Sequence, residues 1–145
     1  MNFNPDYKLD VNDVQNLKNN ILAGKCIITI QSTETLKHYT FKIKKSKQPD
    51  KNIHFIYVLA DGDKYIYFAT IFNEKDLATT KNSKMKKDST CFLAFRYLWL
   101  NILAGNVKNL NKLNIFHSGK CNRCGKTLTE PESIKRGLGP YCANH

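Results

Sequence analysis

Apolar residues near the start of the chain recur with helical spacing, and further along they change to a two-residue period. Val14, Leu17 and Ile21 lie one turn apart, which predicts a helix over residues 10–23. Asp10 is a suitable N-cap for this helix, because its side chain can accept a hydrogen bond from the first turn. A glycine follows the segment, as is common after a helix end.

Four segments rich in Ile, Thr, Tyr, Phe and Val come next, and this composition is typical of strands on a half-buried surface. They cover residues 25–31, 38–44, 53–60 and 64–72. Asp61-Gly62-Asp63 joins the last two and predicts a tight hairpin turn. We therefore expect an antiparallel sheet of about four strands.

A second helix is predicted over residues 90–103, with Asp88 or Ser89 as its N-cap. Its side chains are apolar nearly all round, so we expect a buried helix wrapped by the sheet. Residues 106–113 are polar and rich in Asn, which suits a connector. The predicted fold is α+β, with a sheet-and-helix domain over residues 1–113 and a small module over residues 114–145.

The small module carries three of the five cysteines. Cys121 and Cys124 form a Cys-x2-Cys pair followed by glycine, and Cys142 comes after a further 17 residues. The N-terminus has no secretion-signal pattern, so metal ligands or free thiols are expected before disulfides. The other two, Cys26 and Cys91, lie in apolar patterns and are expected as small core residues.

The cysteine spacing predicts a zinc site, because structural zinc takes four tetrahedral nitrogen or sulfur ligands. A module with so few large apolar residues also needs a metal to stay folded. Two histidines compete as the fourth ligand: His145 would complete a Cys-x2-His pair on a terminal helix, and His117 lies shortly before the first cysteine. Spacing alone favours His145. A Cys-x2-Cys turn, a hairpin and a ligand on a short helix together predict a treble-clef-like module.

The segment Cys-Asn-Arg-Cys-Gly-Lys-Thr-Leu-Thr-Glu-Pro-Glu-Ser-Ile-Lys-Arg-Gly-Leu-Gly-Pro-Tyr-Cys, residues 121–142, resembles a family of small zinc domains of unknown function. These domains occur in bacteriophage, plasmid and actinobacterial proteins. Upstream, residues 65–71, 83–84 and 94–96 also resemble the sheet-and-helix part of phage-encoded members. The resemblance implies zinc and an origin in a phage or mobile element. It shifts the preference for the fourth ligand to His117, because members often carry a histidine shortly before the Cys-x2-Cys pair.

The net charge of +11 invites a nucleic-acid interpretation, but 20 of the 23 basic residues are lysines, a bias that an AT-rich gene produces by itself. The argument therefore depends on where the lysines lie. In the segment 40–44 apolar and basic residues alternate, so Lys42 and Lys44 would share one sheet face while Phe41 and Ile43 face the core.

Tyr65 and Tyr67 alternate in the same way, and a face of lysines and tyrosines could hold a phosphate backbone and stack unpaired bases. A Lys-rich loop and the basic zinc module would extend this surface. The predicted nucleic-acid contacts are Lys42, Lys44, Lys45, Lys47, Tyr65, Tyr67, Lys84, Lys86, Lys87, Arg123, Lys126, Lys135 and Arg136.

The main expectation is thus a non-enzymatic, zinc-containing accessory protein that binds nucleic acid with a preference for single strands. The alternative is a protein-interaction module that uses the same basic surface, as a modulator of a host enzyme, an anti-defence factor or a virion component. An enzyme such as a nuclease is disfavoured because no carboxylates cluster as Mg²⁺ ligands do. No apolar run reaches the ~18–20 residues of a membrane span, and the host-cell cytoplasm is the expected location, with the virion as the alternative.

Overall fold

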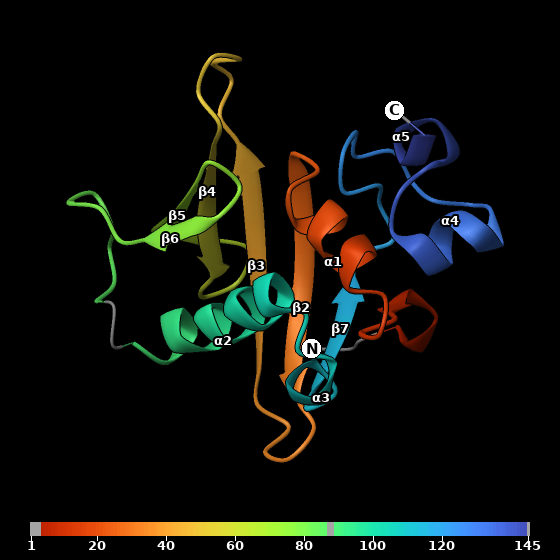
Figure 1. Cartoon of the computed structure of the whole chain (residues 1–145), viewed down its shortest axis with the longest axis horizontal. Coiled ribbons are helices and arrows are strands. Elements are labelled where there is room, and N and C mark those ends of the chain that lie inside the picture. The colour runs from red at the N-terminus through yellow and green to blue at the C-terminus, as the bar shows by residue number, and fades with distance from the viewer. Residues whose placement is uncertain (1–3, 87–88, 145) are drawn as a thin grey trace.

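The computed structural model describes residues 4–86 and 89–144 (Figure 1). Its centre is a seven-stranded antiparallel sheet with the order β1-β7-β2-β3-β4-β5-β6. The strands are β1 (Lys8–Leu9), β2 (Lys25–Ser32), β3 (His38–Lys45), β4 (Ile53–Leu59), β5 (Tyr65–Phe72), β6 (Asp76–Ala78) and β7 (Leu113–His117). The helices are α1 (Val14–Ile21), α2 (Thr90–Ala104), α3 (Val107–Leu110), α4 (Pro131–Arg136) and α5 (Pro140–Asn144), and a short 3-10 helix covers Pro5–Tyr7.

The α+β class is confirmed, and the four strands expected from periodicity are present as β2 to β5. The sheet has seven strands, however, so the expected total of about four is wrong. Strands β1 and β6 contain two and three residues, which is too short to display a period. Strand β7 follows an Asn-rich stretch that the sequence suggests to be a connector. It is nevertheless an inner strand, because β1 and β2 pair with its two edges.

The first helix begins later than expected. Asp13 rather than Asp10 is its N-cap, and the Asp13 side chain accepts a hydrogen bond from the Asn16 N–H at 3.1 Å. Asp10 instead closes a turn by accepting from the Asn12 N–H at 2.9 Å. Helix α2 has Ser89 as its N-cap, one of the two residues predicted for that role. No helix in the described part of the chain is long and apolar enough to cross a membrane.

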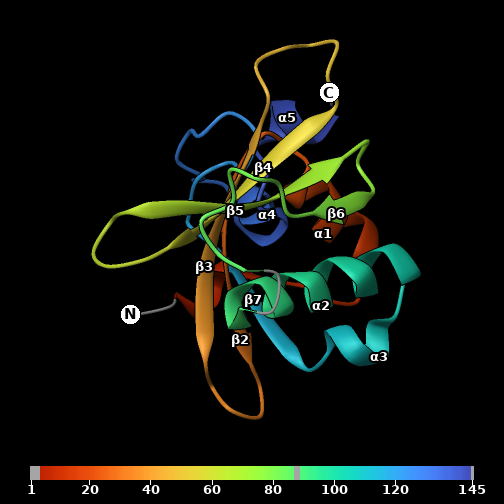
Figure 2. The same ribbon diagram turned by 90° about the vertical axis from the view of Figure 1, so that its left-hand side faces the viewer.

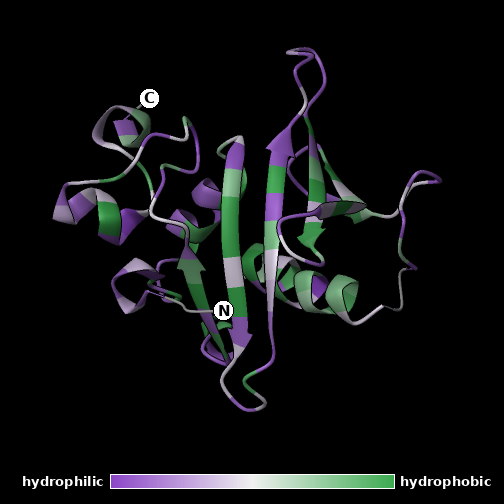
Figure 3. Ribbon diagram, turned by 180° about the vertical axis from the view of Figure 1, so that it is seen from behind, coloured by the Kyte–Doolittle hydropathy of each residue, from purple (hydrophilic) through white to green (hydrophobic). Residues whose placement is uncertain are grey.

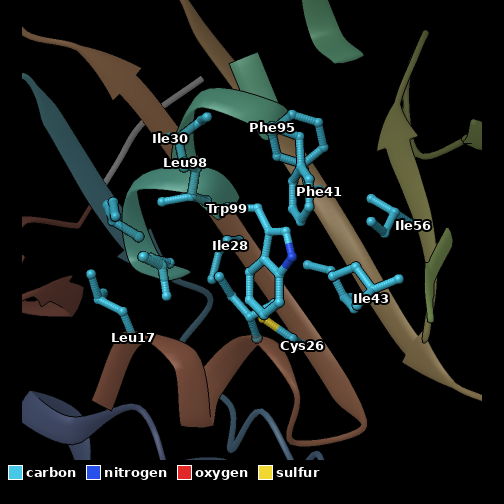
Figure 4. Close-up of a cluster of buried hydrophobic side chains, with 14 of the residues drawn as sticks. Leu17, Cys26, Ile28, Ile30, Phe41, Ile43, Ile56, Phe95, Leu98 and Trp99 are labelled. Carbon is cyan, nitrogen blue, oxygen red and sulfur yellow. The ribbon is translucent and has the colours of Figure 1, made fainter. Parts of the chain in front are cut away.

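Helices α1 and α2 lie on the same face of the sheet (Figures 1 and 2). Between them and the strands is the main core, in which Trp99 packs among Cys26, Ile28 and Ile43 (Figure 4). The Trp99 indole N–H donates to the Lys75 carbonyl at 2.8 Å, so its one polar atom is satisfied. Cys26 and Cys91 are both buried core residues, as expected.

The sheet does not wrap around α2, contrary to the expectation from its apolar composition. One side of the helix is buried, whereas Leu93 and Leu100 on its outer side are 49% and 41% exposed. The physical reason is that a single sheet layer can cover only one side of a helix, and no second layer lies over α2 within the described residues.

The other face of the sheet, here called the open face, is crossed by no helix in the described part of the chain (Figure 3). Strand alternation and register place on it the side chains of Thr40, Lys42, Lys44, Phe55, Tyr57, Tyr65, Tyr67 and Thr70. A β-bulge between Ile56 and Tyr57 shifts the pairing of β4 with β5. Because of this shift, consecutive Phe68 and Ala69 are both buried in the core.

Candidate metal centre and open sheet face

The three cysteines of the C-terminal module meet at one point. The Sγ atoms of Cys121, Cys124 and Cys142 all lie within 4.8 Å of one another. A tetrahedral metal with Zn–S bonds of about 2.3 Å holds its sulfurs roughly 3.8 Å apart, so the thiols are already close to ligand geometry. The described part of the chain therefore contains a cluster that could bind a metal ion.

The cluster forms because the local backbone is a tight turn. The Cys121 N–H donates to the Lys126 carbonyl at 2.8 Å, and the Gly125 N–H donates to the Cys121 carbonyl at 2.9 Å. Gly125 has a positive φ of 82°, which a glycine adopts without strain. Cys142 reaches the same point from the short helix α5, which begins at Pro140.

Backbone hydrogen-bond donors and the closeness of the thiols to one another shift the pKa values of Cys121 and Cys142 in opposite directions. Burial opposes ionisation of Cys121, but N–H groups of Gly139, Cys124 and Arg123 outweigh it and lower its pKa to about 7. Burial and the two neighbouring thiols raise the pKa of Cys142 to about 11. A bound cation would offset the repulsion between neighbouring thiolate charges. Metal binding at this cluster must therefore release protons from the thiols.

His117 does not join the thiols in this structure. Its Nδ1 accepts a hydrogen bond from the Gly119 N–H at 2.9 Å, and its Nε2 donates to the Ile134 carbonyl at 2.5 Å. The ring is buried and stacks on Tyr7, with ring centroids 4.8 Å apart. To act as a ligand, His117 would have to break one of these bonds. His145, the other predicted ligand, lies outside the described residues.

The cysteine module is joined to the sheet through Asn122, which lies between the first two cysteines. Its backbone carbonyl accepts from the Lys25 N–H at 2.8 Å, and its side-chain oxygen accepts from the Ile27 N–H at 3.0 Å. Its Nδ2 donates to Asn20 on α1 at 2.7 Å. These hydrogen bonds tie the cysteine cluster directly to β2 and α1.

The open face brings together a lysine and two tyrosines from three strands. The Nζ of Lys42 on β3 lies 5.3 Å from the ring centroid of Tyr65 and 5.9 Å from that of Tyr57. Both distances are within the range of cation–π attraction. Tyr57 and Tyr67 pack edge to face with centroids 5.8 Å apart, which extends the aromatic surface along the strands.

A groove of about 440 Å³ lies on this face. Phe55, Tyr57 and Tyr67 line it, and Lys81 and Asn82 close it from the Lys-rich loop. The loop is held in place on β5, because the Lys84 N–H donates to the Tyr67 carbonyl at 3.0 Å. The Tyr67 hydroxyl also bonds to Thr80 Oγ1 at 3.0 Å. Of the described loop lysines, Lys81 thus lies at the edge of an aromatic groove.

The other predicted contacts are spread over the molecule. Lys45 pairs with buried His54, so alternation places it on the face opposite to Lys44, and Lys47 follows the strand end. Lys86 is exposed in the loop, whereas Lys87 lies outside the described residues. The remaining basic residues belong to the cysteine module: Arg123 and Lys126 lie beside the thiols, and Lys135 and Arg136 lie on α4.

Tyr57 and Phe55 are absent from the sequence-based prediction of the surface. Their signal is the alternation Ile-His-Phe-Ile-Tyr in residues 53–57, which places both rings on one face. The interpretation of that face depends on which strands pair, and pairing cannot be read from one strand alone.

Comparison with known proteins gives one finding. No curated protein and no solved structure matches the chain. Residues 115–145, which contain the three cysteines, match the model of a family of unknown function, DUF6011.

Proposed function

We propose that this protein is a non-enzymatic accessory protein that binds nucleic acid on its open face and carries zinc in its C-terminal module. The observation that carries the proposal is Lys42 positioned over Tyr57 and Tyr65. An amine and aromatic rings side by side can contact a phosphate and stack a base of the same strand. An accessory role in a phage or mobile element is part of the proposal and rests on the sequence resemblance.

Single strands fit this surface better than duplexes. Stacking requires an unpaired base with a free face, and the rings belong to a sheet rather than to a helix that could enter a major groove. Lysine dominates the basic residues and acts as a point charge rather than a planar fork. We therefore propose binding that is largely electrostatic, sensitive to salt and tolerant of sequence.

Zinc is the metal that we propose for the cysteine cluster. Three thiolates form a soft donor set, which disfavours Mg²⁺ and Ca²⁺ and is typical of zinc sites in proteins without redox function. Elemental analysis of the purified protein should give about one zinc per chain, and almost none in the Cys121→Ala variant. The same analysis of His117→Ala and His145→Ala tests each histidine as the fourth ligand.

Nucleic-acid binding is tested by fluorescence anisotropy with single- and double-stranded DNA and RNA over a salt titration. Single strands should bind more tightly than duplexes, and affinity should fall steeply as salt increases. The Tyr57→Leu variant removes one stacking ring and should weaken binding roughly 5- to 100-fold, since stacking contributes about 1–3 kcal/mol per base. Tyr97→Leu is the matched control, because it removes a tyrosine ring on α2, on the helix side of the sheet, without changing the charge.

Two results would contradict the proposal. One is the absence of binding at low salt, and the other is equal binding by wild type and Tyr57→Leu. If instead a single host protein were captured stoichiometrically and withstood nuclease treatment, the basic surface would be a protein-interaction site.

A further inference from the structure

A pocket of about 710 Å³ opens beside the three cysteines. Its wall consists of the turn that carries Cys121 and Cys124, the segment 126–130, and the first residues of α4 and α5. A metal ion bound to three sulfurs at about 2.3 Å fills only a small part of such a space. The metal cluster therefore borders a cavity that can hold a further small ligand.

One buried polar atom in the wall of this pocket has no partner. Ser133, in the first turn of α4, is 1% exposed, and its Oγ makes no hydrogen bond within the described part of the chain. A buried hydroxyl without a partner is unfavourable. Because Ser133 lines the same pocket as the three thiols, this hydroxyl indicates a ligand that accepts its hydrogen bond.

The charges around the pocket favour an anionic ligand. Arg123 and Lys126 line it and outnumber the one acidic residue in the wall, Glu130. A divalent metal with three thiolates has a net charge of about −1, which an added anion would make more negative. The two basic side chains compensate for that added charge.

His117 does not contribute a metal ligand in this structure, since both of its ring nitrogens are engaged by Gly119 and Ile134. Among the described residues, only the three cysteines bring ligand atoms to this point. We propose that the fourth coordination position of the metal faces the pocket and takes small anionic ligands, with Ser133 donating a hydrogen bond to the bound anion. This inference rests on the metal site of the proposed function.

The experiment uses the full chain loaded with Co²⁺, whose visible absorption bands report the ligands around the metal. Azide is the probe. Titration should change the cobalt bands in a saturable way in the wild type and equally in His145→Ala. Ser133→Ala should bind azide roughly ten- to a hundredfold more weakly, because a hydrogen bond to a charged group is lost. Ser46→Ala is the matched control, since Ser46 follows β3 and does not line the pocket.

Each other outcome overturns the inference. Cobalt absorption bands that azide leaves unchanged in the wild type but changes in His145→Ala would make His145 the fourth ligand. Bands that ignore azide in both would mean a closed site, and equal azide affinity of Ser133→Ala and Ser46→Ala would remove the role of the hydroxyl. Failure of the folded protein to bind cobalt at all would overturn the proposed metal site as well, which distinguishes the two failures. Circular dichroism checks that each variant is folded.

Discussion

Gly137 is a tight steric junction between the cysteine module and the rest of the molecule. It has a positive φ of 83°, and a Cβ atom added there would lie 2.3 Å from Asn20 Oδ1 and 3.2 Å from Leu9. Asn20 cannot move away easily, because it is fully buried and bonded to both Asn122 and the Arg136 carbonyl. This one position therefore decides how closely α4 can approach α1.

We predict that Gly137→Ala lowers the free energy of unfolding by about 3 kcal/mol or more, from backbone strain plus the clash. Gly105→Ala is the matched control: Gly105 also has a positive φ, 64°, but a Cβ there would meet no atom within 4 Å. It should cost about 1 kcal/mol. Urea denaturation measures both values, and equal losses would show that the contact with Asn20 is unimportant.

His54 is a buried residue that makes stability depend on pH. Burial lowers its pKa below 6.5; the Lys45 charge acts in the same direction, while the bond from Nε2 to the Leu22 carbonyl and the Glu74 charge oppose it. The neutral ring therefore contributes stability that is complete above pH 6.5 and is lost as the pH falls through the lowered pKa.

We predict that His54→Leu makes the free energy of unfolding less dependent on pH below about 6.5, where the wild-type ring becomes protonated. The measurement is urea denaturation across that range, at a fixed zinc concentration for all variants. Ile56→Val changes a buried, non-titrating side chain on the same strand β4; it is the control and should keep the pH dependence of the wild type. A His54→Leu profile parallel to that of the wild type would contradict the assignment.

At the level of elements, the Cys-x2-Cys turn and β2 form one hydrogen-bonded unit. Asn122 is 1% exposed and bonds through its side chain to the Ile27 N–H and to Asn20. These contacts place the turn beyond the end of β7, where it continues the path of that strand beside β2. The position of the cysteine cluster is thus set by the same strand that anchors the core.

We predict that Asn122→Ala costs about 2–5 kcal/mol of stability, because it leaves two buried polar partners unsatisfied. It should also weaken zinc binding, measured by competition with a chelating dye, since the turn loses its anchor. The exposed Asn52→Ala variant, between β3 and β4, is the control for the loss of an amide. Unchanged zinc affinity in Asn122→Ala would mean that the turn organises the thiols without β2.

At the scale of the whole molecule, the boundary between residues 1–113 and 114–145 falls within β7, inside the sheet. Strand β7 carries His117 at its end and lies between β1 and β2. A metal bound only by the folded state stabilises whatever unfolds together with its site. The core around Trp99 is connected to that site through β2 and α1.

We predict that removing the metal with a chelator lowers the unfolding midpoint of the entire chain in one transition. Trp99 is the only tryptophan and lies in the main core, so its fluorescence reports on the sheet rather than on the module. Its midpoint should fall with that of the circular dichroism signal. If the chelator left the Trp99 fluorescence midpoint unchanged, the main core and the cysteine module would unfold independently.

Much of the fold follows from local patterns. The period of two in β2 to β5 and the nearly uniform apolar composition of α2 identify these elements without any tertiary information. The Cys-x2-Cys turn is equally local, because its two cysteines and following glycine lie within five residues. Strands β1, β6 and β7 could not be found this way, since they are short and are stabilised by their neighbours in the sheet.

By itself, the sequence determined the main strands, the long helix and the turn that brings Cys121 close to Cys124, because each depends on residues close together in the chain. Only the tertiary structure decided that Tyr57 joins Lys42 and Tyr65, and that His117 bonds to Gly119 and Ile134 instead of lying among the thiols. Strand register and the burial of a ring depend on residues far along the chain. A buried ring that forms hydrogen bonds with such residues, as His117 does with Ile134, is no longer available for the role that its spacing suggests.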